Sequence, residues 1–398
     1  MTGSSTPLPA LAKRTEAFEE SDIRRMFDLA EERGGDLVRL EIGEPDFDTP
    51  EHIVEACTEA ASTGATHYTH NAGITELRAA IADRYARDAD RDVDPGSEIA
   101  VTVGAMQSVN FALQAVADPG DEVVVPTPAW VNYFTIADLL NLEAVQGPLA
   151  AEDQFDIAPE PIEAAITEDT SAVVVNSPSN PTGRVFDADA IREVVELAAD
   201  HGAYVVADEV YDQITYGEDR PSVATVAGEY DNVVSANSFS KTYAMTGWRV
   251  GWMVAPPPIV DAARKFQQGT TTCAPSIAQH AAVEALEGTQ EPIEEMQAAF
   301  AKRRDFIVDR ITELPEISCP TPQGGFYAFV DVSSLDGTSF EVARRLLDDH
   351  GVVTVPGSGF GDQGEGYLRI SFANDLDRLR EGFDRIEQFL ADELEGRA

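Results

Sequence analysis

Short aliphatic runs alternate with helical patterns through the middle of the chain, and this alternation restricts the fold more than any other feature. Two of the helical patterns are AMQSVNFALQAVA and DADAIREVVELAADHG. The aliphatic runs are IAVTV (99–103), DEVVVP (121–126), SAVVVNSP (171–178), AYVVADEV (203–210), NVVSAN (232–237) and RVGWMVAP (249–256). Apolar strands that alternate with helices are typical of an α/β fold with a mostly parallel sheet, buried on both faces.

The two ends of the chain have a different pattern. SDIRRMFDLAEERG predicts a short helix with Ser21 as N-cap and Gly34 as its stop. A long helical stretch (about 291–314) precedes strand-like runs at GGFYAFVDV, VVTVP and GYLRISF, and an amphipathic helix follows. We expect residues 1–46 to form an arm and part of a small α+β domain, residues 47–290 a large α/β domain, and residues 291–398 the rest of the small domain.

The charge of the chain is extreme and evenly spread. There are 28 basic and 71 acidic residues, which gives a formal net charge of −43. Such a surface repels nucleic acid and anionic membranes, so neither is an expected partner. Spread acidity with only four lysines predicts a protein kept soluble in concentrated salt, that is, a halophile's protein.

The cysteines and the N-terminus indicate a cytoplasmic protein without a metal site. Cys57, Cys273 and Cys319 are far apart and odd in number, which suits a reducing compartment. The cysteines and six histidines show no metal-ligand spacing. The N-terminus has no apolar signal region, and no stretch reaches membrane-spanning length.

Polar residues gather at the ends of the expected strands, where ligands bind in open α/β sheets. Each has an ordinary alternative as a turn residue, a helix cap or an ion-pair partner. Together they supply what pyridoxal phosphate needs: an anion site, a carboxylate for the ring nitrogen, a phenol and amide for the ring oxygen, and a lysine. The residues are Gly104, Ala105 and Met106, then Ser179–Gly183, Asp208, Tyr211, Ser238, Ser240, Lys241 and Arg249.

Seven segments in order carry a resemblance to a known family. They are LEIGEPDFDTP, YTHNAGITELR, TVGAMQSVNFALQAV, NSPSNPTG, DEVYDQITY, SFSKTYAMTGWRVG and GYLRISFA. The chain resembles the class I/II aminotransferases of fold type I, in the aspartate aminotransferase superfamily, and within it the prokaryotic subgroup that includes many archaeal members. The resemblance implies pyridoxal 5'-phosphate as cofactor, a seven-stranded sheet between helices, and a homodimer.

The resemblance also implies roles for the residues around the cofactor ring. Lys241 would form the Schiff base with the cofactor and act as the general base that moves a proton between Cα and the cofactor C4′. Asp208 would pair with the ring nitrogen, Tyr211 and Asn180 would bond the ring oxygen, and Trp130 would stack on the ring and contact the substrate.

Further roles concern the phosphate and the substrate. By the resemblance, the phosphate would be held by Gly104, Ala105, Met106, Ser238, Ser240 and Arg249, with Tyr68 reaching that of the neighbouring subunit. Arg369, with Asn180 and the Gly43 backbone, would clamp the substrate α-carboxylate. The implied reaction is a ping-pong transfer of the amino group of an L-amino acid to a 2-oxo acid such as 2-oxoglutarate.

Two positions bear on the choice among reactions and substrates. Acid-specific relatives carry a lysine or hydroxyl residue at the position of Met106, so aspartate and a broad or apolar substrate range both stay open. Eliminating relatives tend to place tyrosine at the position of Trp130, which favours transamination over the alternative of a β-eliminating C–S lyase. A nicotinamide dehydrogenase is excluded because PGSGFGDQGEG is followed by a strand-like run and not by a helix. A transcription regulator would need an additional DNA-binding domain and a basic surface.

Overall fold

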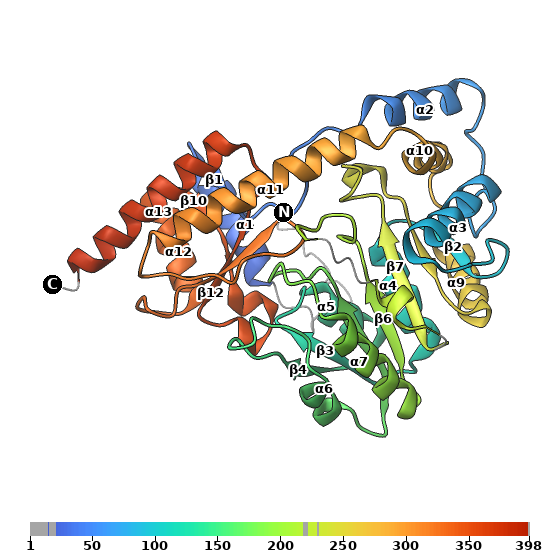
Figure 1. The fold of residues 1–398 in the computed structure, drawn as a ribbon, viewed down its shortest axis with the longest axis horizontal. Coiled ribbons are helices and arrows are strands. Elements are labelled where there is room, and N and C mark those ends of the chain that lie inside the picture. Colours follow the sequence, from blue (N-terminus) through green and yellow to red (C-terminus); the bar gives the residue numbers. More distant parts are fainter. Residues whose placement is uncertain (1–14, 16–20, 218–221, 229–230, 397–398) are drawn as a thin grey trace, which may run out of the picture.

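A mixed seven-stranded sheet is the centre of the fold (Figure 1). The computed structural model describes residue 15 and residues 21–217, 222–228 and 231–396. The sheet order is β2-β8-β7-β6-β5-β3-β4, and only β8 runs antiparallel to its neighbours. Its strands are β2 (Ile99–Thr102), β3 (Glu122–Thr127), β4 (Glu143–Pro148), β5 (Thr170–Asn176), β6 (Tyr204–Asp208), β7 (Val233–Ser238) and β8 (Gly251–Val254).

Both faces of this sheet are buried, as the unbroken aliphatic runs predict. Along β3, Val123 and Val125 pack on one side with Phe111 and Ile136, whereas Val124 packs on the other side with Val194. Successive side chains of a strand point to opposite faces, so one run supplies two cores. The helices of this part of the chain are α2 (Glu51–Ser62), α3 (Thr75–Ala89), α4 (Ala105–Val116), α5 (Asn132–Leu140), α6 (Pro159–Ala165), α7 (Ala188–Asp200), α8 (Val223–Val226), α9 (Pro257–Thr270) and α10 (Ser276–Glu287).

All six aliphatic runs form strands of this sheet, and the prediction of a mostly parallel α/β sheet is confirmed. The seventh strand, β4, is not among those runs. It lies at the sheet edge with largely solvent-accessible side chains, so it has no aliphatic run to reveal it. Arg249 does not start β8 as predicted; it precedes Gly251 by two residues and has a left-handed backbone (φ 55°).

The last third and the N-terminal segment pack around a second core. The strands β11 (Val355–Pro356), β12 (Tyr367–Ser371) and β9 (Tyr327–Asp331) form an antiparallel sheet in that order. Near the N-terminus, β1 (Val38–Arg39) pairs in parallel with β10 (Val352–Val353). VVTVP therefore contributes to two sheets, and not to a single strand. The helices here are α1 (Asp22–Arg33), α11 (Glu291–Thr312), α12 (Ser339–His350) and α13 (Leu376–Gly396).

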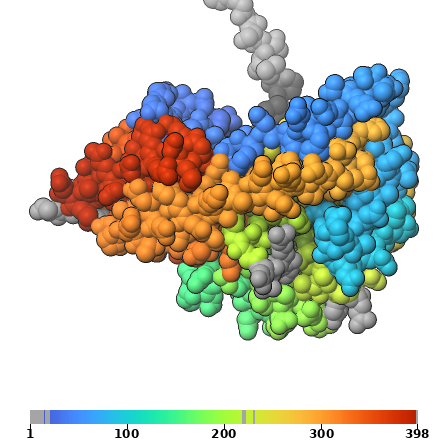
Figure 2. All heavy atoms as spheres, turned by 45° about the horizontal axis from the view of Figure 1, so that its top comes forward, coloured from blue at the N-terminus to red at the C-terminus, as the bar shows by residue number. Residues whose placement is uncertain are grey.

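The terminal helices follow the predicted patterns. The Ser21 side chain accepts the Arg24 N–H at the start of α1, and Gly34 ends the helix with φ 58°. The predicted apolar stripe of α13 faces the core: Leu376 is partly buried there, and the buried members are Leu379, Phe383, Ile386 and Leu390. Figure 2 shows α11 as a long orange band between the C-terminal part and the α2–α10 end of the molecule. The domain boundaries at residues 46/47 and 290/291 stay a prediction.

The described part of the chain holds no candidate for a membrane-spanning helix or for a metal site. No described helix is both long and apolar enough to span a bilayer. No described group of three or more His, Cys, Asp or Glu side chains is arranged to hold a metal ion.

Candidate active site

A cavity of about 590 Å³ opens at the carboxyl ends of the parallel strands. Its walls come from three regions: the strand ends of the large sheet, the strands β9 and β12, and the N-terminal segment with α1. Because β8 runs antiparallel, Arg249, two residues before its first residue, reaches the same edge of the sheet as Asp208 at the end of β6. The predicted site residues in the wall are Gly43, Ala105, Met106, Trp130, Asn180, Asp208, Tyr211, Ser238, Ser240, Lys241, Arg249 and Arg369.

Lys241 projects its amine into this cavity from the turn after β7. The Nζ donates to the main-chain oxygen of Gly43 and lies 5.9 Å from the centre of the Tyr211 ring. Burial lowers the pKa of Lys241 to about 8, and the charge of Glu44 opposes this shift. A lysine with a lowered pKa is partly neutral near pH 8, and a neutral amine is the form that attacks a carbonyl carbon.

Asp208 ends strand β6 and is only 3% exposed. Its Oδ2 accepts a hydrogen bond from the Tyr133 hydroxyl at 2.8 Å, and its Oδ1 accepts the Val210 N–H at 3.3 Å. Burial raises the pKa of Asp208 to about 6, while the Tyr133 hydrogen bond lowers it. The carboxylate is therefore mostly ionised at neutral pH and faces a cavity in which a cationic partner would stabilise it.

Another part of the cavity wall consists of Tyr211, Tyr327 and Arg369. The hydroxyls of Tyr211 and Tyr327 are 3.1 Å apart, and the Arg369 guanidinium lies 4.4 Å from the Tyr327 ring centre. Arg369 donates from Nη1 to Asn180 Oδ1 at 3.1 Å and from Nη2 to the Glu41 main-chain oxygen at 2.7 Å. Its Nε is buried without a hydrogen-bond partner among the described atoms. The guanidinium thus keeps capacity for an anionic ligand.

Ser238, Ser240 and Arg249 lie together at the N-terminus of α4. The Ser238 hydroxyl donates to the Ser240 Oγ at 2.7 Å, and Arg249 donates to the Thr246 main-chain oxygen at 2.8 Å. Gly104 caps α4 with φ 79°, and a Cβ there would stand 2.7 Å from Arg249 Nη2. Backbone N–H groups, two hydroxyls and a guanidinium in one place form a cradle for a phosphate group.

The remaining predicted residues have distinct positions. Trp130 lines the cavity and meets Tyr133 edge-on, with ring centres 5.6 Å apart. Met106 lines the outer part and is 36% exposed. Gly104 is behind the cavity wall, as the cap of α4. Tyr68 is 86% exposed and does not line the cavity of its own chain.

Sequence reasoning missed Tyr133 and Tyr327. Tyr133 follows Trp130 by three residues, so helical spacing places both rings on one side of a turn. Tyr327 lies in a run that was predicted as a strand, but nothing in that run shows which residue faces a ligand. Both tyrosines are fully buried and each hydrogen-bonds a predicted site residue.

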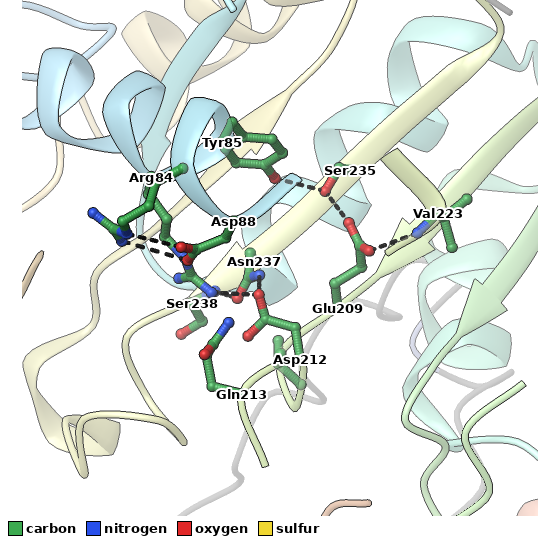
Figure 3. Close-up of polar contacts among 12 residues, drawn as sticks. Arg84, Tyr85, Asp88, Glu209, Asp212, Gln213, Val223, Ser235, Asn237 and Ser238 are labelled. Carbon is green, nitrogen blue, oxygen red and sulfur yellow. Dashed lines mark hydrogen bonds and ion pairs between the residues drawn. The ribbon is translucent and has the colours of Figure 1, made fainter. Parts of the chain in front are cut away.

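A buried polar cluster lies behind the cavity (Figure 3). Arg84 of α3 forms an ion pair with Asp212, which also accepts the Asn237 side-chain N–H at 2.9 Å. Asn237 in turn accepts the main-chain N–H of Ser238 at 2.7 Å. The cluster therefore connects α3 to one of the hydroxyl residues of the phosphate cradle.

Comparisons with known proteins show the family of the chain. The sequence profile described as "Aminotransferase class I and II" matches residues 35–386. The chain belongs to this family. It is 38% identical to aromatic-amino-acid aminotransferase 2 of Thermococcus litoralis and 39% identical to an aspartate aminotransferase of Pyrococcus abyssi, with 96% of this chain and 98% of each relative covered. The structure of the Thermus thermophilus aspartate aminotransferase with maleate superposes with a TM-score of 0.91 at 36% identity, covering 96% of this chain and 100% of that one.

The protein is accordingly an aminotransferase of fold type I, and the predicted fold class and enzyme class are confirmed. The lyase alternative is not favoured by the names of the relatives. The residues of this aminotransferase also fit the cofactor that the family implies. A Cβ at Gly104 would fill the cradle beside Arg249, and a carboxylate, a phenol and a lysine surround the space next to it.

Proposed function

We propose that this aminotransferase binds pyridoxal 5'-phosphate in the cavity and moves the amino group of an L-amino acid to a 2-oxo acid in two half-reactions. The observation that carries the proposal is that Lys241, Asp208 and the phosphate cradle open onto one cavity. When bound, the cofactor supplies an aldehyde for amines and a ring that withdraws electrons from the substrate Cα. The protein's own residues bind, orient and transfer the proton.

Lys241 is the proposed attachment residue and general base. Because burial lowers the pKa of Lys241 to about 8, its Nζ has an accessible neutral form that accepts the Cα proton of a substrate. Asp208 would hold a protonated ring nitrogen as an ion pair when the cofactor is bound. Its hydrogen bond from Tyr133 keeps the carboxylate oriented and favours the charged form. Tyr211 and Asn180 are assigned to the ring oxygen, and Trp130 to the face of the ring.

The cradle residues are assigned to the phosphate. Arg249 contributes the charge, Ser238 and Ser240 contribute hydroxyl donors, and the turn from Gly104 to Met106 contributes backbone N–H groups at the start of α4. Tyr68 is exposed on the surface of the chain, which supports its assignment to the phosphate of a second subunit in a homodimer.

Arg369 is assigned to the α-carboxylate of the substrate. The contacts to Asn180 and to the Glu41 main chain fix the plane of the guanidinium, and Gly43 leaves the approach open. A carboxylate fixed by Arg369 would restrict the rotation of the substrate about its Cα, so that this side chain would help to select which Cα bond breaks.

The proposed substrates are aspartate or a broader, apolar set of amino acids. The two named relatives act on aromatic amino acids and on aspartate, and Met106 offers an apolar wall. Both classes of substrate therefore belong in the test.

Single-turnover absorbance titration with aspartate, alanine and phenylalanine tests the proposal. The band of the bound cofactor should change with each reactive amino acid, with release of the 2-oxo acid and without ammonia. Ammonia and pyruvate from cysteine-like substrates would indicate the lyase. Lys241→Ala should abolish the half-reaction, whereas Lys265→Ala, at an exposed position of α9, should not. Substantial turnover by Lys241→Ala would refute the assignment.

A further inference from the structure

One cationic side chain in the cavity wall has no part in the proposed function. Among the residues that the structure describes, four basic ones line the cavity: Arg24, Lys241, Arg249 and Arg369. The last three are assigned to the cofactor aldehyde, the phosphate and the α-carboxylate. The chain has 28 basic and 71 acidic residues, so a fourth basic residue at the same cavity is unexpected. Its presence suggests that it binds an anionic group of a ligand.

Arg24 lies at the outer end of the cavity. Its side chain is 61% exposed, and two apolar residues of the same wall, Phe27 and Met106, are 37% and 36% exposed. The groups assigned to the cofactor ring and the α-carboxylate are deep, since Asp208 and Arg369 are 3% and 5% exposed. A substrate that is fixed at its α-carboxylate therefore directs its side chain toward the outer end.

The present partner of the Arg24 guanidinium is easily exchanged. Arg24 donates from Nε to Asp28 Oδ2 at 3.1 Å, with Nη2 2.8 Å from Oδ1, one helical turn away. Both side chains of this pair are exposed, and such i,i+4 pairs contribute little to stability. The guanidinium also lies 5.1 Å from the Phe27 ring centre. The ring contacts the planar face of the guanidinium and leaves its N–H donors, which point along the edge, uncovered.

Two acidic residues in the wall are already engaged. Glu44 accepts a hydrogen bond from the Thr246 hydroxyl at 2.8 Å. Its negative charge also acts on Lys241, where it opposes the lowering of the pKa by burial. Glu41 is buried and paired with Arg39. Among the described contacts, neither residue forms an ion pair or a hydrogen bond with the Arg24 guanidinium. The apolar side chain of Met106 brings no charge to the outer end.

We propose that Arg24 is the specificity-determining residue that binds the side-chain carboxylate of a dicarboxylic substrate, such as aspartate, glutamate or 2-oxoglutarate. This assignment rests on the proposed function. The apolar side chains of Met106 and Phe27 in the same wall would contact aliphatic and aromatic substrates, so one cavity would serve both classes.

Arg25 provides a matched control on the same helix. It pairs with Asp22 at 2.8 Å, covers the Phe340 ring at 4.1 Å and does not line the cavity. Arg24→Gln and Arg25→Gln each remove one positive charge from α1. A general electrostatic effect would therefore appear in both variants, whereas a direct contact appears in one.

The experiment compares half-reaction rates and dead-end binding in the cofactor-loaded proteins. Arg24→Gln should lower kcat/KM for aspartate and glutamate by about 10- to 100-fold, the loss expected for one charge-assisted pair. The values for alanine and phenylalanine should stay within about twofold, and Arg25→Gln should leave all four within about twofold. In calorimetry, Arg24→Gln should weaken the binding of succinate by a similar factor and leave the affinity for butyrate unchanged. Arg24→Lys should restore part of the succinate affinity, because it restores the charge.

Three results would overturn the assignment of Arg24. They are an equal loss for all four amino acids, no selective loss for the dicarboxylic ones, or the same loss in Arg25→Gln. If the wild-type protein transfers no amino group from any of the four, the proposed function itself fails. If it transfers them and Arg24→Gln does not discriminate, only the role of Arg24 fails.

Discussion

The hydroxyl of Tyr133 should control the proton affinity of Asp208, and Tyr133→Phe tests this with the loss of a single atom. The variant keeps the ring and its edge-on contact with Trp130. It removes the 2.8 Å hydrogen bond to Asp208 Oδ2, which leaves the longer 3.3 Å bond from the Val210 N–H to Oδ1. Both side chains are almost completely buried, so water does not replace the lost donor.

The size of the effect follows from the charge of the acceptor. A hydrogen bond to a charged group is worth about 1.5–3 kcal/mol, and one pKa unit corresponds to about 1.4 kcal/mol. The pKa of Asp208, which burial raises to about 6, should therefore rise by roughly 1–2 further units in the variant. At neutral pH the variant would hold a largely protonated Asp208, a poorer partner for a cationic ring nitrogen.

The sign of the stability effect can be stated in advance. A carboxyl whose pKa is higher in the folded than in the unfolded protein lowers the free energy of unfolding as pH rises between the two values. For the wild type this interval ends near pH 6. For Tyr133→Phe it extends to about pH 7–8. The cost of the substitution should thus be larger at pH 8.5 than at pH 5, by about 1.5–3 kcal/mol.

Urea unfolding of the cofactor-free protein at the two pH values measures this difference, at one protein and salt concentration. Tyr216→Phe is the control, because the Tyr216 hydroxyl donates to the main-chain oxygen of Gly325 and not to a carboxylate. Its cost should be the same at both pH values. If the cost of Tyr133→Phe is also the same within about 0.5 kcal/mol, the hydroxyl does not tune Asp208.

Three further predictions concern the cradle, the buried cluster and Lys241. Arg84→Met should lower the free energy of unfolding by about 3–5 kcal/mol, because it leaves Asp212 without its buried partner; a cost below about 1 kcal/mol in urea would contradict this. Gly104→Ala should weaken the binding of pyridoxal 5'-phosphate by about tenfold or more in equilibrium dialysis, since it adds a Cβ 2.7 Å from Arg249 Nη2 at a φ of 79°. An unchanged affinity would refute the assignment of these residues to the phosphate. The rate at which Lys241 attaches to the cofactor should be half-maximal near pH 8 in stopped-flow absorbance, and a rate that still rises above pH 10 would show an ordinary lysine.

Much of the large sheet could be predicted because buried parallel strands have aliphatic residues on both faces. Strand β5 reads TSAVVVN for this reason, and its side chains pack into two different cores. The edge strand β4 has no such requirement, and its sequence EAVQGP gives no comparable signal. The segment VVTVP shows a second limit: its residues are all buried, but they belong to two sheets, which only the tertiary pairing determines.

The candidate site could be predicted where chemistry requires a particular residue type. Lys241 and Asp208 stand out because few side chains form a Schiff base or hold a ring nitrogen. Tyr133 did not stand out, because a tyrosine in a helix is usually a packing residue. Its role depends on a contact to a strand 75 residues away in sequence. Arg24 was missed for a similar reason, since an exposed arginine on an amphipathic helix has no signal of its own.

The segment after β6 has consequences for anyone who wishes to redesign this enzyme. Within five residues, Asp208 and Tyr211 face the cavity, whereas Glu209 and Asp212 belong to the buried polar cluster behind it (Figure 3). A substitution on one side of this turn also disturbs the other side, so single changes in this segment should affect both the cavity and the buried cluster. At the outer end of the cavity, Arg24 comes from a separate helix, α1, and its side chain is exposed to solvent. Libraries that diversify α1 while they keep the turn intact should yield new substrate ranges with the fewest unfolded variants.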